Sequence, residues 1–307
     1  MRILLVVLYL LCSWGTACQS VSQNLHHPDQ PFNDRWLFYK GDPPGAESIA
    51  LDDVDWRALD LPHDWAIEGP FDPQYNARTG GLPVHGVAWY RKHFTVPADM
   101  AGKVVSVLFD GAMSRAKVWC NGQLVGQRPF GYIGFSVDLT PHIRFGEENL
   151  IAVQLSPEDL AARWYPGAGI YRNVSLSYND PVHIPTWGTY LTTPEISKEN
   201  ALVKGDIKIV NQGGKKQRVQ LRTQILDADG KTVAETRGEE EIPENATVTH
   251  QFALQVDNPR LWEMETPHLY RAQTQLLRNN QVIDEYETSF GIRSMEASAN
   301  DGFLLNG

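Results

Sequence analysis

Short runs of alternating apolar and polar residues, interrupted by turn residues about every ten positions, dominate this sequence. Such spacing predicts an all-β sandwich, because each run can bury one face of a strand, and helical periodicity is scarce. The Asn121-Gly122 pair after residues 116–120 accepts the positive φ angles of a type I′ turn and therefore predicts a hairpin. Further strands are expected at 90–96, 104–109, 135–139, 150–155 and 171–176.

The pattern changes at Asn179-Asp180-Pro181, where a proline cannot continue a strand ladder. Beyond it, regular alternation such as that of Ile207 and Ile209 continues in about seven runs, which is typical of an immunoglobulin-like sandwich. No cysteine pair lies there, so the buried disulfide of an antibody-type domain is excluded. After Arg293 the alternation stops. Residues 303–307 form an apolar segment for which we expect no pairing partner, so we expect a truncated chain.

The N-terminus has the features of an export signal. Met1-Arg2 supplies a positive end, and residues 3–11 form an apolar run that is too short to span a bilayer but suits a signal-peptide core. The small residues before Cys18 fit either ordinary cleavage or a lipoprotein signal that leaves Cys18 acylated and attached to a membrane. We assign 1–18 to the signal and 19–32 to a linker. The protein is then exported, as a periplasmic protein, a cell-surface lipoprotein or a secreted one.

Charge and motifs argue against several classes of function. There are 27 Lys and Arg against 37 Asp and Glu, and the net charge of −10 opposes binding to nucleic acid. No phosphate-binding loop, His-Glu-x-x-His or Gly-x-Ser-x-Gly motif occurs. We expect His63-Asp64 to form a structural turn rather than part of a triad, and His26-His27 to be solvated rather than a metal site. The sequence therefore predicts no catalytic residue, no metal and no cofactor.

The tryptophans point to carbohydrate, since aromatic faces stack on the C–H surfaces of sugars. Most of the nine are expected to be core anchors. Trp164 differs, because it lies in the irregular segment 163–169, where Gly and Pro set the backbone and loops commonly line binding sites.

Several ordered motifs resemble glycoside hydrolase family 2, close to the bacterial β-galactosidases. They are LPHDW at 61–65, GVAWYRK at 86–92, VWCNG at 118–122 and GIYRNV at 169–174, followed by NPRLW at 258–262, PHLY at 267–270 and FGIR at 290–293. The resemblance implies a jelly-roll (galactose-binding-like) sugar-binding domain at 33–179 and an immunoglobulin-like β-sandwich at 180–293. It further implies that 294–307 begin a (β/α)₈ barrel, which in the family carries the catalytic Glu pair.

The same resemblance implies that Asn76, Arg163 and Trp164 face the sugar pocket. Arg163 stands where relatives often carry an Asp that contacts a sugar hydroxyl, and its guanidinium offers five donors instead. The alternative interpretation is that Arg163 pairs with a carboxylate across the domain interface and Trp164 belongs to the core.

The leading hypothesis is the non-catalytic N-terminal part of an exported exo-β-glycosidase that cleaves terminal β-galactosides with retention of configuration. Its partners would be a β-galactoside-containing carbohydrate and its own missing barrel. The sequence does not decide whether the protein forms a homo-oligomer. The alternatives are a free-standing carbohydrate-binding or adhesion module, and a pure scaffold. The apolar residues 303–305 favour the enzyme, because a free module should end in polar residues.

Overall fold

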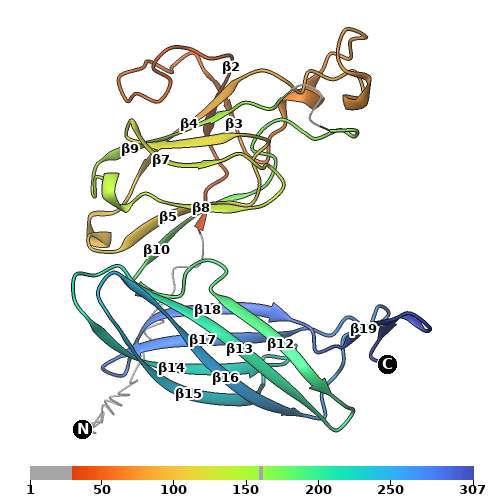
Figure 1. Cartoon of the computed structure of the whole chain (residues 1–307). Coiled ribbons are helices and arrows are strands. Elements are labelled where there is room, and N and C mark those ends of the chain that lie inside the picture. Colours follow the sequence, from red (N-terminus) through yellow and green to blue (C-terminus); the bar gives the residue numbers. More distant parts are fainter. Residues whose placement is uncertain (1–29, 159–161) are drawn as a thin grey trace, which may run out of the picture.

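Two β-sandwiches follow one another along the chain in the computed structural model (Figure 1). The structure describes residues 30–158 and 162–307, so the predicted signal at 1–18, Cys18 and positions 19–29 of the predicted linker lie outside it. The described residues form strands and four short 3-10 helices, which confirms the all-β prediction. In this part of the chain, no helix is long and apolar enough to cross a membrane.

The first sandwich has the two-sheet form expected of a jelly roll. One sheet has six strands in the order β3-β2-β4-β9-β6-β7, and the other has four in the order β1-β10-β5-β8. The strands are β2 (Trp36–Lys40), β3 (Arg57–Leu59), β4 (Ala88–Thr95), β6 (Ala116–Cys120), β7 (Gln123–Arg128), β9 (Glu148–Leu155), and β1 (Gln30–Pro31), β5 (Val104–Phe109), β8 (Phe135–Asp138), β10 (Val174–Asn179). The 3-10 helices are η1 (Trp65–Glu68), η2 (Ala77–Thr79), η3 (Ala98–Met100) and η4 (Thr140–His142).

The inner faces of these sheets hold the first core. Its aromatic residues include Trp36, Trp65, Tyr90 and Phe109, each of them buried. The hairpin predicted at Asn121-Gly122 is present, with both residues at positive φ between β6 and β7. Cys120 is buried and unpaired, and burial raises the pKa of its thiol to about 11, which suits a structural cysteine.

Two strand predictions at the domain ends need correction. Strand β10 begins at Val174 rather than Tyr171, because the Tyr171 hydroxyl donates to the Gly131 carbonyl (2.8 Å) and so ties that residue to another loop. Gln30–Pro31, at the end of the predicted linker 19–32, pair with β10 as strand β1. The first sandwich thus includes residues before its predicted start at position 33.

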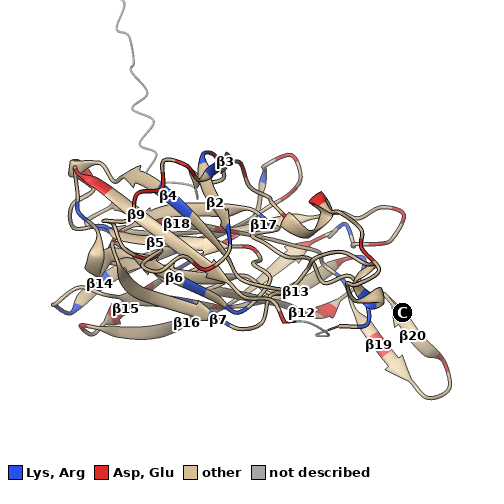
Figure 2. Cartoon of the chain, turned by 90° about the horizontal axis from the view of Figure 1, so that it is seen from above, with Lys and Arg blue, Asp and Glu red and all other residues tan. Residues whose placement is uncertain are grey.

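The second sandwich packs the sheet β11-β13-β12, extended by β16, against the sheet β15-β14-β17-β18. Alternation governs it as expected: every second residue of β13 is buried along its whole length. The strands are β11 (Val182–His183), β12 (Thr189–Ile196), β13 (Asn200–Asn211), β16 (Ala246–Asp257), and β14 (Gln217–Leu226), β15 (Thr232–Ile242), β17 (Tyr270–Arg278), β18 (Gln281–Phe290). Lys and Arg are spread among Asp and Glu over both domains (Figure 2).

The apolar segment 303–307 does pair, contrary to expectation. Strand β19 (Met295–Ser298) and strand β20 (Gly302–Leu305) form a hairpin that projects beyond the sandwiches (Figure 2). Asn306 anchors its base, since its amide donates to the Trp262 carbonyl (3.1 Å) and its side-chain oxygen accepts from the Ser294 amide (3.0 Å). That 294–307 begin a barrel stays a prediction.

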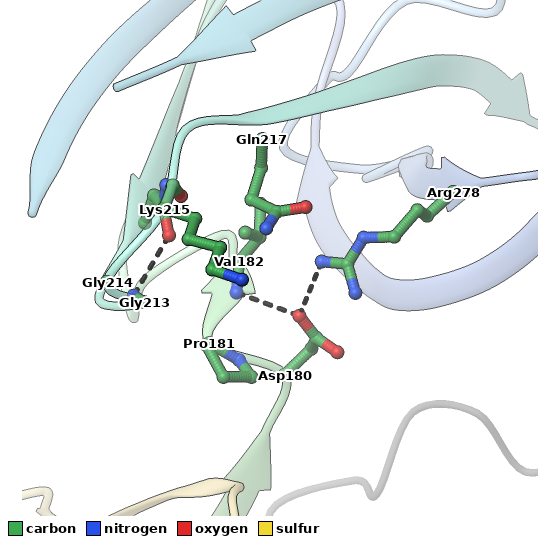
Figure 3. Close-up of a pocket in the computed structure, with 9 residues that line it drawn as sticks. Asp180, Pro181, Val182, Gly213, Gly214, Lys215, Gln217 and Arg278 are labelled. Atoms are coloured by element: carbon green, nitrogen blue, oxygen red, sulfur yellow. Dashed lines mark hydrogen bonds and ion pairs between the residues drawn. The ribbon is translucent and has the colours of Figure 1, made fainter. Parts of the chain in front are cut away.

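The linker between the sandwiches is clamped to the second one. The Asp180 carboxylate accepts from the Val182 amide and from the Arg278 guanidinium, both at 2.9 Å (Figure 3). A pocket of about 310 Å³ lies beside this clamp. Across the junction, the Trp187 ring covers Gly134, where an added Cβ would approach it to 3.1 Å. A side chain at position 134 would therefore require the Trp187 ring and the Phe109 carbonyl to shift by a few tenths of an ångström.

A buried carboxylate is hydrogen-bonded to the segment that follows the same linker. Asp284 on β18 is 3% exposed, and it accepts a hydrogen bond from the Ile184 amide (2.8 Å). Burial raises its pKa to about 7. Because the folded pKa lies above the unfolded one, this group favours folding at acid pH, and that contribution is lost as the pH rises toward and through 7.

We therefore expect Asp284→Asn to stabilise the protein at pH 8, by about 2–4 kcal/mol, and to change it little near pH 4, since the amide oxygen can still accept from Ile184 and carries no buried charge. Urea unfolding of the second sandwich between pH 4 and 8 measures this. The exposed Asp229→Asn is the matched control. The same pH dependence in Asp284→Asn and wild type would contradict the assignment.

Candidate functional site

One carboxylate organises the loops at one end of the first sandwich. Asp64 Oδ1 accepts from the Ala66 amide at the start of η1 and from the Ala168 amide, both at 3.0 Å. Its Oδ2 accepts from the Tyr165 hydroxyl at 2.7 Å. Both carboxylate oxygens are therefore used to hold loop 163–169 against η1.

The side chain of His63 also makes hydrogen bonds within the fold. Its Nδ1 lies 2.7 Å from the Tyr90 hydroxyl and its Nε2 lies 3.2 Å from Glu68, which also receives two hydrogen bonds from Arg57. Burial lowers the pKa of His63. The His63 carbonyl packs directly against Gly169, where an added Cβ would come within 2.2 Å. His63-Asp64 thus has the structural role that the sequence predicted.

Asn76 has an unused donor. Its side-chain oxygen caps η2 by accepting from the Arg78 amide (3.0 Å), while its buried Nδ2 has no hydrogen-bond partner among the described residues. A buried donor left unpaired costs about 1–3 kcal/mol, so such groups are normally satisfied by water or by a ligand. The side-chain amide of Asn76 is therefore a buried donor that the described residues leave unsatisfied.

Two further donors lie near the same loop. Lys40 Nζ stands 4.1 Å above the Trp65 ring and donates to the His85 carbonyl (2.9 Å), and the His85 ring contacts that of Tyr75. Burial lowers the pKa of Lys40 to about 8. The buried Nε1 of Trp65 also lacks a partner in the part of the chain that the structure describes. Of these two donors, only the Trp65 indole is thus left without an acceptor among the described residues.

Arg163 and Trp164 both lie on the surface of the described residues, so Trp164 is not part of the core of this sandwich. Arg163 is exposed and makes no ion pair with the residues described. Trp164 is 60% exposed, and its Nε1 donates to the Tyr132 hydroxyl at 2.8 Å. Four of the other tryptophans, at positions 36, 56, 65 and 89, are buried as expected.

The structure brings the predicted residues to one end of the sandwich but does not link them all. Loop 163–169 runs beside η1, since the Trp65 amide donates to the Ala168 carbonyl (2.9 Å). The segment from η1 to η2 lies at the same end (Figure 1), and Asn76 caps η2, but no hydrogen bond joins Asn76 to Arg163 or Trp164 within the described residues. Sequence reasoning missed Lys40 and Tyr132, and only the general abundance of aromatic residues hinted at the latter.

The fold is thus a jelly roll followed by an immunoglobulin-like sandwich. Residues 57–181 match the sugar binding domain of glycosyl hydrolases family 2, and residues 182–293 match a second domain of glycosyl hydrolases family 2. The chain belongs to glycosyl hydrolase family 2.

Relatives agree on this assignment. The chain is 43% identical over 95% of its length to Beta-galactosidase BoGH2A of Bacteroides ovatus, of which it covers 34%. It is 34% identical over 90% of its length to a Beta-glucuronidase of Formosa agariphila, of which it covers 30%. A crystal structure of a family 2 member from Bacteroides cellulosilyticus superimposes with a TM-score of 0.85 at 39% identity, over 91% of this chain and 37% of that one. The chain thus spans about a third of the length of these relatives.

The Asp64 anchor can be tested by substitution. We expect Asp64→Ala to destabilise the first sandwich by about 2–4 kcal/mol, because it removes the acceptor of two amides and a hydroxyl at once. Asp64→Asn should be milder, since it keeps an acceptor for the amides. Chemical unfolding followed by tryptophan fluorescence measures both. A change below about 0.5 kcal/mol in Asp64→Ala would show that the loop is held by other contacts.

Proposed function

We propose that these two domains are the non-catalytic N-terminal part of an exo-β-glycosidase that acts on β-galactosides. The observation that carries the proposal is the buried, unpaired amide of Asn76 in the part of the chain that matches the family's sugar binding domain. Together with Arg163 and Trp164 it would form one wall of the pocket for the terminal sugar. Arg163 is free to donate to a hydroxyl, and Trp164 offers an open ring face.

The galactoside assignment rests on the relatives. Identity to the relative named a β-galactosidase is 43%, against 34% to the one named a β-glucuronidase. The segment 165–172 also resembles galactosidases more than glucuronidases.

A carboxylate pair elsewhere in the protein would catalyse the cleavage of the glycosidic bond. In a retaining glycosidase two carboxylates about 5–5.5 Å apart act as acid/base and nucleophile. The carboxylates beside the candidate site are occupied instead: Asp64 holds loop 163–169, and Glu68 pairs with Arg57 and His63. Such engagement suits binding and support rather than proton transfer.

The proposal includes export of the protein from the cytoplasm. The apolar run at 3–11 and the small residues before Cys18 would direct the protein out of the cytoplasm, with Cys18 either removed or acylated. A carbohydrate too large to enter the cell would then be accessible to it.

The substrate preference is the first test. We expect the protein, expressed to the end of its reading frame, to hydrolyse 4-nitrophenyl β-galactoside with a kcat/KM at least about tenfold above that for the β-glucuronide, because a pocket built for a hydroxymethyl group leaves a carboxylate poorly matched. The 307-residue chain alone should show no hydrolysis. A preference for the glucuronide would overturn the galactoside assignment, and activity of the 307-residue chain would overturn the non-catalytic role.

The role of Arg163 is the second test. In the same longer protein, Arg163→Ala should lower kcat/KM for the β-galactoside by about tenfold or more, since a hydrogen bond from a charged donor is worth about 1.5–3 kcal/mol. Arg260→Ala, at an exposed arginine of the second sandwich, is the control and should leave the rate unchanged. Unchanged kinetics with a lowered melting temperature in Arg163→Ala would show that this arginine is structural.

A further inference from the structure

Three exposed aromatic rings, that of Trp164 among them, form a continuous surface on the first sandwich. Trp164 is 60% exposed, Tyr132 40% and Phe130 56%. The Trp164 Nε1 donates to the Tyr132 hydroxyl at 2.8 Å, and the centroids of the Tyr132 and Phe130 rings lie 5.5 Å apart with their planes at 58°. We call these three residues the aromatic shelf.

The shelf is held in place before any ligand arrives. Its loop between β7 and β8 is fastened by the Tyr171 hydroxyl, which donates to the Gly131 carbonyl at 2.8 Å. Gly131 sits so close to Met113 that an added Cβ would come within 2.5 Å of its sulfur. On the other side, Asp64 holds the loop that carries Trp164. Rings fixed in this way bind with little further loss of conformational entropy.

Exposed aromatic rings contribute less to the stability of the fold than buried ones. Burying a large apolar side chain stabilises a fold, so contiguous exposed rings commonly mark a binding surface. Three partly exposed rings offer at most a few hundred Å², since a whole aromatic side chain buries about 150–250 Å². A stable protein partner covers about 800 Å² on each side. The shelf therefore fits a small ligand better than a protein.

The polar groups around the rings favour a sugar. The Tyr132 oxygen accepts from Trp164, and within the described residues the Tyr132 hydroxyl donates to no other group. Arg163, next to Trp164, has no ion-pair partner among the residues described. Ring faces flanked by free donors match a pyranose, which presents a C–H face and hydroxyl edges. All these residues lie within the match to the family's sugar binding domain.

We propose that the aromatic shelf binds a second sugar unit, on the leaving-group side of the glycosidic bond, so that the preferred substrate is a β-galactosyl oligosaccharide. This inference rests on the proposed function, since it takes the terminal sugar to lie by Asn76 and Arg163. Trp164 is then shared between the two sugar positions.

The experiment measures saccharide binding by the 307-residue chain itself. Saturation-transfer NMR is recorded with a β-galactosyl trisaccharide and, separately, with galactose. We expect transfer to the non-terminal units of the trisaccharide, a signal at least fivefold weaker with galactose, and a loss of at least fivefold in both Trp164→Ala and Phe130→Ala. Tyr190→Ala, at an equally open tyrosine on β12, is the control and should keep the full signal. Melting temperatures confirm that each variant is folded.

Several results would overturn the proposal that the aromatic shelf binds a sugar. They are no transfer to the trisaccharide in wild type, equal transfer to galactose, or a signal that Tyr190→Ala lowers as much as Trp164→Ala. The hydrolysis assay separates the two proposals. Galactoside hydrolysis without trisaccharide binding by the shelf removes this inference alone, whereas shelf binding in a protein that prefers glucuronides removes the galactoside assignment alone.

Discussion

The candidate site depends on the carboxylate of Asp64. With three hydrogen bonds it joins the start of η1 to loop 163–169, two segments about a hundred residues apart in the chain. Desolvation, together with the bond to this carboxylate, raises the pKa of Tyr165, so that hydroxyl stays a donor at neutral pH. Without the anchor, the loop of Arg163 and Trp164 would be held by fewer contacts, such as the bond from the Trp65 amide to the Ala168 carbonyl. With the anchor, both residues project from a fixed end of the sandwich.

Rigidity extends from this end to the junction between the domains. Gly169 packs on the His63 carbonyl, and the Trp187 ring covers Gly134 where the sandwiches meet. On the far side, Asp180 binds Arg278, and the buried Asp284 holds Ile184. These contacts keep both sandwiches in one orientation, which a module needs if it is to present a wall to a pocket formed with another domain.

Local pattern was sufficient to predict most strands. Alternation identified β13 and its neighbours, and the Asn121-Gly122 pair identified a hairpin, because both signals lie within a few residues. The errors came from contacts that no local pattern encodes. Tyr171 leaves the strand because its hydroxyl binds a carbonyl 40 residues away. The segment 303–307 pairs because residues 295–298 turn back on it.

The site was predictable only in part. The irregular segment around Trp164 and the family motifs pointed to Asn76, Arg163 and Trp164, but the partner of the Trp164 indole lies 32 residues away, on a loop with no motif. The unpaired amide of Asn76 is likewise invisible in a sequence, since it follows from which oxygens the fold leaves within reach.

The central claim is that the side-chain amide of Asn76 donates a hydrogen bond to an oxygen atom of a bound sugar. The most direct measurement is the ¹H–¹⁵N spectrum of the Asn76 side chain, assigned with Asn76→Ala, during titration with a β-galactoside. We predict a concentration-dependent shift of the Asn76 Nδ2 resonance, while the amide of the distant Asn280 does not move. A shift in neither resonance at saturating ligand, or equal shifts in both, would contradict the account.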